Sequence, residues 1–179
     1  MTVEASDNAN SDIGQLLGEL KILVVEDSET MRSLLIALLQ TMGIRHISCA
    51  KDGRSGLSLF IEVQPDLVIT DGIMAPMSGY AMTRAIRELR EPDGAHSRLA
   101  DVPILMLSGH GERQKVEQAR NDGVTDYIVK PVMPELLYAR VVAAISTPIH
   151  IVETSTYRGP SPRRRLVAHS AFDLSNDKK

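Results

Sequence analysis

Residues 21–27 read KILVVED and residues 66–71 read DLVITD, so two short apolar runs each end in acidic residues. Two later runs are built alike: ILMLS at 104–108 ends in Ser108, and YIVK at 127–130 ends in Lys130. Short runs rich in Val, Ile and Leu are typical of strands buried on both faces of a parallel sheet. Such strands open at their carboxyl ends into one crevice, so the sequence predicts that these runs deliver their last residues to one place.

Apolar runs alternate with amphipathic stretches along most of the chain. Strands are predicted at Lys21–Glu26, Ile44–Cys49, Asp66–Asp71, Val102–Ser108 and Thr125–Val129, and helices at Glu29–Met42, Gly53–Val63, Tyr80–Arg90, Glu112–Asp122 and Pro134–Ile145. Gly43 and Gly123 stand where left-handed helix C-caps are expected. Repeated βα units with tight connections predict an α/β fold with a doubly wound parallel sheet in the strand order 2-1-3-4-5. The longer connection Arg90–Asp101 is predicted to be a surface insertion.

The chain of 179 residues is long enough for one domain, which we predict at residues 21–146, after a lead-in at 1–20 and before an extension at 147–179. The lead-in is expected to be flexible or a short helix, and the extension irregular. Residues 1–146 carry 14 Lys or Arg and 20 Asp or Glu, whereas residues 147–179 carry 6 and 3. A basic extension on an acidic body predicts an anionic partner for the extension.

The bulk composition favours a cytoplasmic protein. The hydrophobic share of 43% and the charged share of 24% are ordinary for a globular domain. No apolar run approaches the roughly 18 residues of a membrane span, and the N-terminus lacks a secretory pattern, so no membrane insertion is expected. The single Cys49 argues against disulfides and fits a reducing compartment.

The predicted crevice offers the ligands of a hard divalent cation. Mg²⁺ takes oxygen ligands and usually keeps several waters, so two or three carboxylates suffice. We predict Asp27 and Asp71 as direct ligands, Glu26 as a ligand directly or through water, and the backbone carbonyl of Ile73 as a further one. No cysteine lies nearby, and no histidine has ligand spacing, which argues against zinc.

The same residues suit the transfer of a phosphoryl group to an aspartate. Asp71 on the central strand is the predicted nucleophile, with Lys130 supplying a fixed positive charge and Ser108 a hydroxyl hydrogen bond. Taken singly, an acid after a strand is more often a helix N-cap, but four strand ends with complementary groups favour a site. An enzyme of the haloacid-dehalogenase type would need a second acid two residues after the nucleophile, where this chain has Ile73.

Four motifs resemble the receiver domain of bacterial two-component response regulators, over about Lys21–Ile145: ILVVEDS (22–28), ITDGIMAPMSG (69–79), ILMLSG (104–109) and DYIVKP (126–131). The resemblance implies a flavodoxin-like fold, dependence on Mg²⁺, and phosphorylation of Asp71 by a histidine kinase or a phosphotransfer protein. It implies a signalling protein that itself catalyses this transfer, not an enzyme acting on a substrate. It further implies that Ser108 turns toward the phosphoryl group and that Tyr127 swings inward as a switch.

Two departures from the family pattern concern the predicted pocket. The acidic pair is Glu26-Asp27, where Asp-Asp is commoner. The usual Met-Pro after the acceptor is replaced by Met74-Ala75-Pro76, which places the proline one residue late. The family pattern therefore does not fix the path of the loop after Asp71 or the position of the Ile73 carbonyl.

The extension contains a second candidate site, YRGPSPRRR at 157–165. Tyr157 adjoins Arg158, every basic residue of the segment is Arg, and its glycine and prolines restrict the backbone. Guanidinium groups and a tyrosine ring suit a planar ligand that carries phosphate, such as a nucleotide. A solvated basic linker and a nucleic-acid-binding tail are the alternatives. About thirty residues after the last helix are too few for a DNA-binding domain, so output is expected through protein contacts or the tail.

The segment at roughly Thr154–Val167 resembles the arginine-rich extension of the Cle family, which are CheY-like effectors of cyclic di-GMP. The resemblance implies that the extension binds cyclic di-GMP and that the protein docks on the flagellar motor switch. The residues that it assigns to the nucleotide are Tyr157, Arg158, Arg163, Arg164 and Arg165. An ordinary phosphorelay or chemotaxis receiver, with no nucleotide at its tail, is the alternative.

Overall fold

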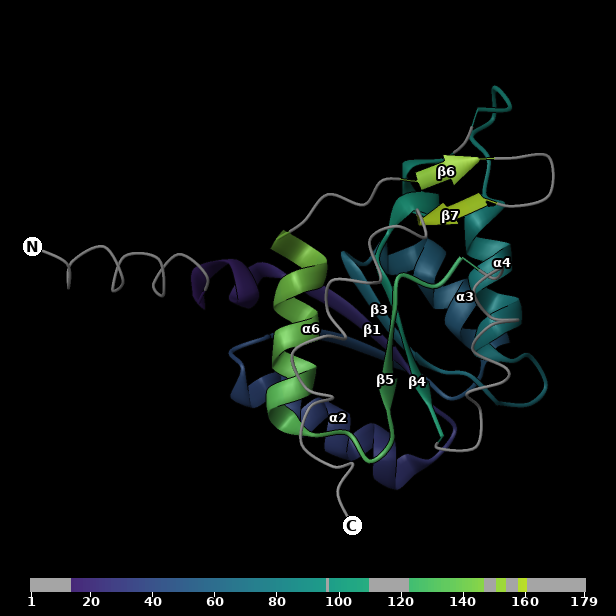
Figure 1. The fold of residues 1–179 in the computed structure, drawn as a ribbon. Helices are drawn as coiled ribbons and strands as arrows, with labels where there is room; N and C mark the ends of the chain where they lie inside the picture. The colour runs from purple at the N-terminus through teal and green to yellow at the C-terminus, as the bar shows by residue number, and fades with distance from the viewer. Residues whose placement is uncertain (1–13, 96, 110–122, 147–150, 154–157, 161–179) are drawn as a thin grey trace, which may run out of the picture.

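The computed structural model describes residues 14–95, 97–109, 123–146, 151–153 and 158–160. A five-stranded sheet at its centre has the order β2-β1-β3-β4-β5, and every neighbouring pair is parallel. The strands are β1 (Lys21–Val25), β2 (His46–Ala50), β3 (Leu67–Asp71), β4 (Ile104–Ser108) and β5 (Asp126–Val129). The predicted α/β fold and strand order are confirmed (Figure 1).

Helices cover both faces of the sheet (Figure 1). One face is covered by α2 (Glu29–Thr41) and α6 (Pro134–Ser146), and the other by α3 (Gly53–Val63) and α4 (Gly79–Arg87). Buried Leu35 of α2 and Val141 of α6 belong to one apolar cluster, whereas Phe60 of α3 and Met82 of α4 belong to a second. Successive strand residues contribute to opposite clusters because side chains alternate across a strand. The apolar strands are therefore buried on both faces, as their composition predicts.

Several elements begin or end a few residues from their predicted limits. The predicted C-cap at Gly43 is confirmed by its φ of 88°, and the next N–H, of Ile44, donates to the Leu39 carbonyl at 3.2 Å. Ile44 is thus used in the helix cap, and β2 begins at His46. Gly123 also has a positive φ, of 83°. The predicted helix Glu112–Asp122 lies outside the described residues.

The predicted insertion between α4 and β4 is ordered around a buried arginine. Arg87 is 2% exposed, its Nε donates to the carbonyl of Gly123 at 2.8 Å, and its guanidinium also reaches the carbonyls of Ala100 at 2.6 Å and Val102 at 2.8 Å. The last two acceptors lie at the short helix η1 (Arg98–Asp101). Strand β4 follows this helix and begins at Ile104, two residues after the predicted start. The connection is therefore anchored to the body of the domain.

The lead-in before β1 contributes to the core. Residues 14–19 are helical, and Leu17 is 2% exposed within the cluster that contains Leu35 and Val141. The neighbouring Leu16 is 49% exposed. Across the described stretches, none of the helices combines the length and the apolar character that crossing a membrane requires.

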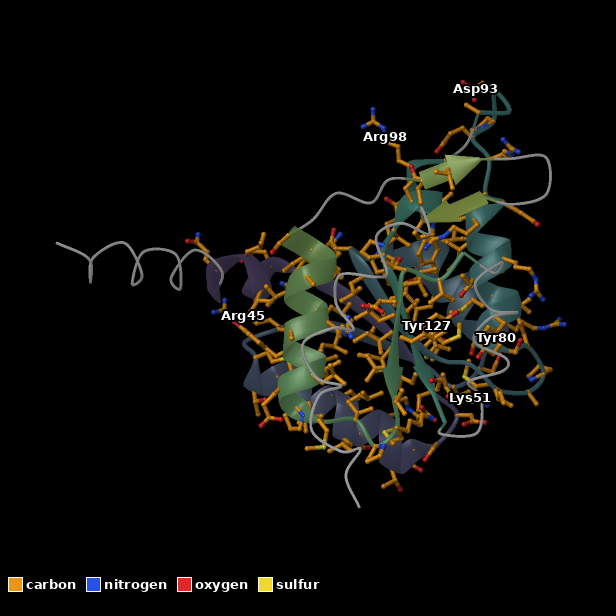
Figure 2. The ribbon with its side chains drawn as sticks, in the orientation of Figure 1. Arg45, Lys51, Tyr80, Asp93, Arg98 and Tyr127 are labelled. Carbon is orange, nitrogen blue, oxygen red and sulfur yellow. The ribbon has the colours of Figure 1, made fainter. Side chains whose placement is uncertain are left out.

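The extension contains a small hairpin that the sequence did not predict. Strands β6 (Ile151–Glu153) and β7 (Arg158–Pro160) pair antiparallel, with Val152 opposite Gly159. The prediction of an irregular extension is therefore wrong for these residues. Such short strands carry little pattern that a sequence reading could detect. The hairpin lies at the end of the molecule where the parallel strands begin, the same end as Asp93 and Arg98 of the insertion (Figures 1 and 2).

Candidate functional site

The carboxyl edge of the sheet gathers three acidic side chains. Asp71 is the last residue of β3, and Glu26 and Asp27 directly follow β1 in the neighbouring position. One carboxylate oxygen from each of these residues lies within 4.8 Å of the others. Because parallel strands end at the same edge, residues about 45 positions apart in sequence meet here.

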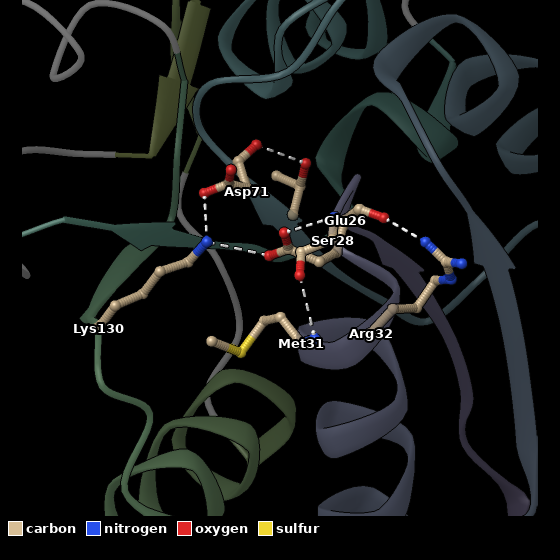
Figure 3. Close-up of polar contacts among 7 residues, drawn as sticks. Glu26, Ser28, Met31, Arg32, Asp71 and Lys130 are labelled. Carbon is tan, nitrogen blue, oxygen red and sulfur yellow. Dashed lines mark hydrogen bonds and ion pairs between the residues drawn. The ribbon is translucent and has the colours of Figure 1, made fainter.

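Lys130 lies between two of these acids (Figure 3). Its Nζ is 2.9 Å from Oδ1 of Asp71 and 3.0 Å from Oε2 of Glu26. Burial alone would lower the pKa of the ammonium, but its hydrogen bonds to Asp71 and Glu26 outweigh burial and raise the pKa above the ordinary value. Lys130 is therefore a fixed cation at neutral pH. Its peptide bond to Pro131 is cis.

Glu26 is buried, and both of its carboxylate oxygens are hydrogen-bonded. It is 1% exposed, Oε1 accepts the N–H of Ser28 at 3.2 Å, and Oε2 accepts from Lys130. Burial raises the pKa of Glu26, and the hydrogen bond from Lys130 opposes that rise. The backbone carbonyl of Glu26 accepts from Arg32 at 2.8 Å, which fixes the strand end on α2.

The other two acids have oxygens available to a ligand. Asp27 is exposed, and within the described segments no hydrogen bond or ion pair involves its carboxylate. The Asp71 side chain is 14% exposed and pairs with Lys130 through Oδ1. Carboxylate oxygens without His or Cys form the donor set that suits Mg²⁺. Asp27 and Asp71 would hold the ion, with Glu26 close enough to act through water.

The remaining predicted pocket residues lie around this cluster. Ser108, the last residue of β4, is 2% exposed, and its carbonyl accepts the backbone N–H of Lys130 at 2.8 Å. Tyr127 is half-buried on β5, three residues before Lys130 (Figure 2). The Ile73 side chain is 53% exposed in the loop after Asp71. The sequence thus located the elements that carry these residues.

Several residues that shape the site were not singled out from the sequence. The hydroxyl of Thr70 donates to the carbonyl of Asp71 at 3.0 Å, and Arg32 holds the carbonyl of Glu26. Gly79 at the start of α4 lies so close to the Asp71 carbonyl that an added Cβ would overlap it. Each of these contacts is made to backbone, so residue type alone gives no signal. Among these residues, only Gly79 is of a type that indicates a close approach between two stretches of backbone.

The second candidate site falls largely outside the described residues. Tyr157, Arg163, Arg164 and Arg165 lie outside them, and the backbone of Arg158 forms the first residue of β7. The predicted nucleotide site therefore remains a prediction from the sequence.

The protein is therefore a doubly wound α/β protein. At the carboxyl edge of its sheet it carries three carboxylates that could hold a metal ion. The family model described as the response regulator receiver domain matches residues 22–142. The chain is also 32% identical over 122 residues to the chemotaxis protein CheY of Pseudomonas aeruginosa, a match that covers 68% of this chain and 93% of that protein. The chain belongs to the response regulator receiver family.

Other similar proteins differ in their length beyond the matched region. A probable transcriptional regulator, ycf27 of Guillardia theta, is 34% identical over 125 residues, and the match spans 70% of this chain but 45% of that protein. Among solved structures, the chemotaxis protein CheY4 of Vibrio cholerae has a TM-score of 0.61 and 28% identity, covering 70% of this chain and 98% of the other. Receiver domains bind Mg²⁺ at an acidic site, and Glu26, Asp27 and Asp71 form an acidic cluster in this chain.

Proposed function

We propose that this protein is a response regulator that accepts a phosphoryl group on Asp71 from a histidine kinase or a phosphotransfer protein. The supporting observation is the position of the Lys130 ammonium, 2.9 Å from Oδ1 of Asp71 inside a cluster of three carboxylates. A lone carboxylate in an acidic cluster repels a phosphate dianion, and a fixed cation on that carboxylate reduces the repulsion. Lys130 also contacts Glu26, but the Glu26 side chain is 1% exposed and that of Asp71 is 14% exposed, so Asp71 is the lysine-paired acid that a phosphoryl donor can reach.

The proposed reaction uses this chain's own residues for attack and for charge stabilisation. A carboxylate oxygen of Asp71 attacks the phosphorus of a phosphohistidine, the P–N bond breaks, and the imidazole leaves with the electron pair. Lys130 donates to the transferred phosphoryl oxygens, and the Ser108 hydroxyl donates a further hydrogen bond. Bound Mg²⁺ would neutralise charge as the phosphoryl group arrives, held by Asp27, Asp71, the Ile73 carbonyl and, directly or through water, Glu26. The receiver catalyses its own modification in this scheme.

Intact-mass spectrometry after incubation with acetyl phosphate and Mg²⁺ tests the acceptor. We expect the mass of one added phosphoryl group on the wild-type protein and none on Asp71→Asn, whose amide is not nucleophilic. Omission of Mg²⁺ should abolish the addition. Equal labelling of the Asp71→Asn variant would show that the acceptor lies elsewhere.

We further propose that the arginine-rich extension binds cyclic di-GMP through Tyr157, Arg158 and Arg163–Arg165, in keeping with its resemblance to the Cle family. The residue types support this proposal, because guanidinium forks can bond guanine edges and phosphates while the tyrosine ring stacks on a base. The division into a lead-in at 1–20, a receiver at 21–146 and an extension at 147–179 belongs to the same proposal. So does a cytoplasmic location, which the single Cys49 favours.

Calorimetric titration with cyclic di-GMP tests the second site. We expect binding to the wild type and its loss in Arg163→Ala/Arg164→Ala/Arg165→Ala. Lys178→Ala/Lys179→Ala is the control, since it removes positive charge from the same extension outside the proposed site, two charges against three. No heat with the wild type would leave an ordinary phosphorelay or chemotaxis receiver. Steep salt dependence with indifference to the base would instead indicate a nucleic-acid-binding tail.

Output is proposed to pass through a partner protein such as the flagellar motor switch. Tyr127 is half-buried on the edge strand β5, close in sequence to Lys130, and this position supports its role as the switch aromatic. Tyr127→Ala should then change partner affinity and leave the phosphorylation of Asp71 intact. The flagellar switch protein would serve as the first partner to test by pull-down.

A further inference from the structure

The loop between β3 and α4, residues 72–78, directly follows Asp71. At its beginning, the N–H of Gly72 donates to a β4 carbonyl at 3.2 Å, which continues the pattern of the sheet. In its middle, Met74 is 7% exposed and packs in the apolar cluster beneath α3 and α4. Ile73, the expected carbonyl ligand, lies between these two points with an exposed side chain. Its position therefore depends on how the rest of the loop is held.

The end of the loop is held by the first residue of α3. The N–H of Gly53 donates to the carbonyl of Met77 at 2.9 Å. A Cβ added at Gly53 would lie 2.7 Å from the Met77 carbonyl oxygen and 2.9 Å from the Ser78 carbonyl oxygen. Both are backbone atoms, so relief of the clash requires a shift of the loop or of the start of α3, and either shift changes how the two fit together. Glycine is the residue that this close approach requires.

Gly53 is itself held in place from two sides. The carboxylate of Asp52 accepts the N–H of Ser55 at 3.0 Å and the hydroxyl of Ser55 at 2.9 Å, which caps α3. One turn further on, a Cβ at Gly56 would lie 3.0 Å from the Val25 side chain, so α3 packs closely on β1. The residue after β1 is the first acid of the cluster. Helix α3 thus connects the strand that carries two acids with the loop that follows the third.

We propose that Gly53 is a positioning residue of the phosphoacceptor pocket, which sets where the loop 72–78 lies relative to Asp71. The inference rests on the proposed function of that pocket and extends it to a helix that contributes no ligand. The backbone hydrogen bond from Gly53 anchors the end of this loop to α3.

Calorimetric titration of the full chain with Mg²⁺ tests the proposal without relying on phosphorylation. Gly53→Ala should weaken Mg²⁺ binding by roughly tenfold, as loss of a contact that orients metal ligands commonly does. Gly18→Ala is the matched control, since a Cβ there would meet nothing closer than 3.8 Å. It should bind Mg²⁺ as the wild type does. Ser55→Ala, a milder change in the cap, should lose affinity in the same direction by less.

A second control separates positioning from general loss of stability. Leu137→Ala removes buried side-chain atoms from the cluster beneath α2 and α6, and should lower Tm with no change in Mg²⁺ affinity. Unchanged affinity in Gly53→Ala, or an equal loss in Leu137→Ala, overturns the proposal. If the wild type neither binds Mg²⁺ nor takes a phosphoryl group from acetyl phosphate, the proposed function fails and this inference fails with it. Binding by the wild type with an unaffected Gly53→Ala variant rejects this inference alone.

Discussion

The Lys130 ammonium bridges Asp71 and Glu26, and the second of these carboxylates is almost completely buried (Figure 3). A buried carboxylate that loses its cation keeps its desolvation cost without compensation, so the removal of one partner is far more damaging than the pair itself is stabilising. Lys130 therefore supports the fold of the pocket as well as its chemistry.

We expect Lys130→Met to lower the free energy of unfolding by about 2 kcal/mol, below the 3–5 kcal/mol of fully buried pairs because Lys130 retains some contact with solvent. Urea denaturation at neutral pH measures this change. In Glu26→Gln/Lys130→Met the buried charge is gone, so much of the loss should be recovered. Simple additivity of the two single substitutions would show that the pair is not coupled.

The principal site residues were predictable from the sequence because each follows an apolar run. Asp71 and Lys130 stand at strand ends, and parallel strands end together. Arg32 and Thr70 were not predictable, because they act on backbone carbonyls of the acidic residues. Every residue has a backbone carbonyl, so a hydrogen bond to one leaves no recognisable pair of residue types in the sequence.

At the scale of elements, α3 shows how one cap fixes a helix next to the pocket. Hydrogen bonds from the backbone of Ser55, and further ones from its side chain and from the N–H of Arg54, lower the pKa of Asp52 below its ordinary value. A carboxylate with a depressed pKa in the folded state stabilises the protein above its unfolded pKa. The stabilisation is lost as the pH falls through the lower, folded value.

This linkage predicts a pH-dependent effect of Asp52→Ala. At pH 7 the variant should unfold at a lower urea concentration than the wild type, because the cap is lost. As the pH falls below 3.8, the ordinary value for this carboxyl, the two midpoints should approach each other. Urea titrations at a series of pH values would show the convergence. A difference that stays constant into the acid range would mean that the ionised cap is not the source of the stability.

The connection after α4 is held by a buried arginine that could not be predicted from the sequence pattern of the helix alone. In the sequence, Arg87 looks like one of several solvated arginines on an amphipathic helix. In the fold it is buried and donates to three carbonyls, two at η1 and one at Gly123. The burial of Arg87 depends on carbonyl groups that come from segments distant in sequence. The hydrophobic periodicity of α4 carries no information about those segments.

At the scale of the whole molecule, the hydrophobic core includes a residue that precedes the first βα unit. Leu17 precedes β1 and is buried in the cluster that α2 and α6 cover. The sequence predicted a flexible lead-in or a short helix, and the helix is what residues 14–19 form. Its burial was not predictable, because one apolar turn gives no indication of the surface it will contact.

Two adjacent leucines allow this packing to be tested within one helix. Leu17→Ala should lower the free energy of unfolding by about 2–4 kcal/mol, as expected for a leucine removed from a packed core. Leu16→Ala, at a site that is 49% exposed, should change it by less than about 0.5 kcal/mol. Chemical denaturation of both variants gives the comparison. Equal effects would place the lead-in helix outside the cooperative core.

The alternation of apolar runs and amphipathic stretches was enough to predict the parallel sheet, because buried parallel strands carry a strong local signal. The strand order was predicted from the common topologies of doubly wound sheets. The hairpin of β6 and β7 carries no such signal in its three-residue strands. It lies at the opposite pole of the molecule from the strand ends that carry the acids, and β7 begins with Arg158 (Figure 1). A kinase that approaches one pole leaves the other uncovered. Under the proposed function, the phosphoryl donor would approach the pole that carries the acids, whereas the backbone of Arg158 lies at the opposite pole.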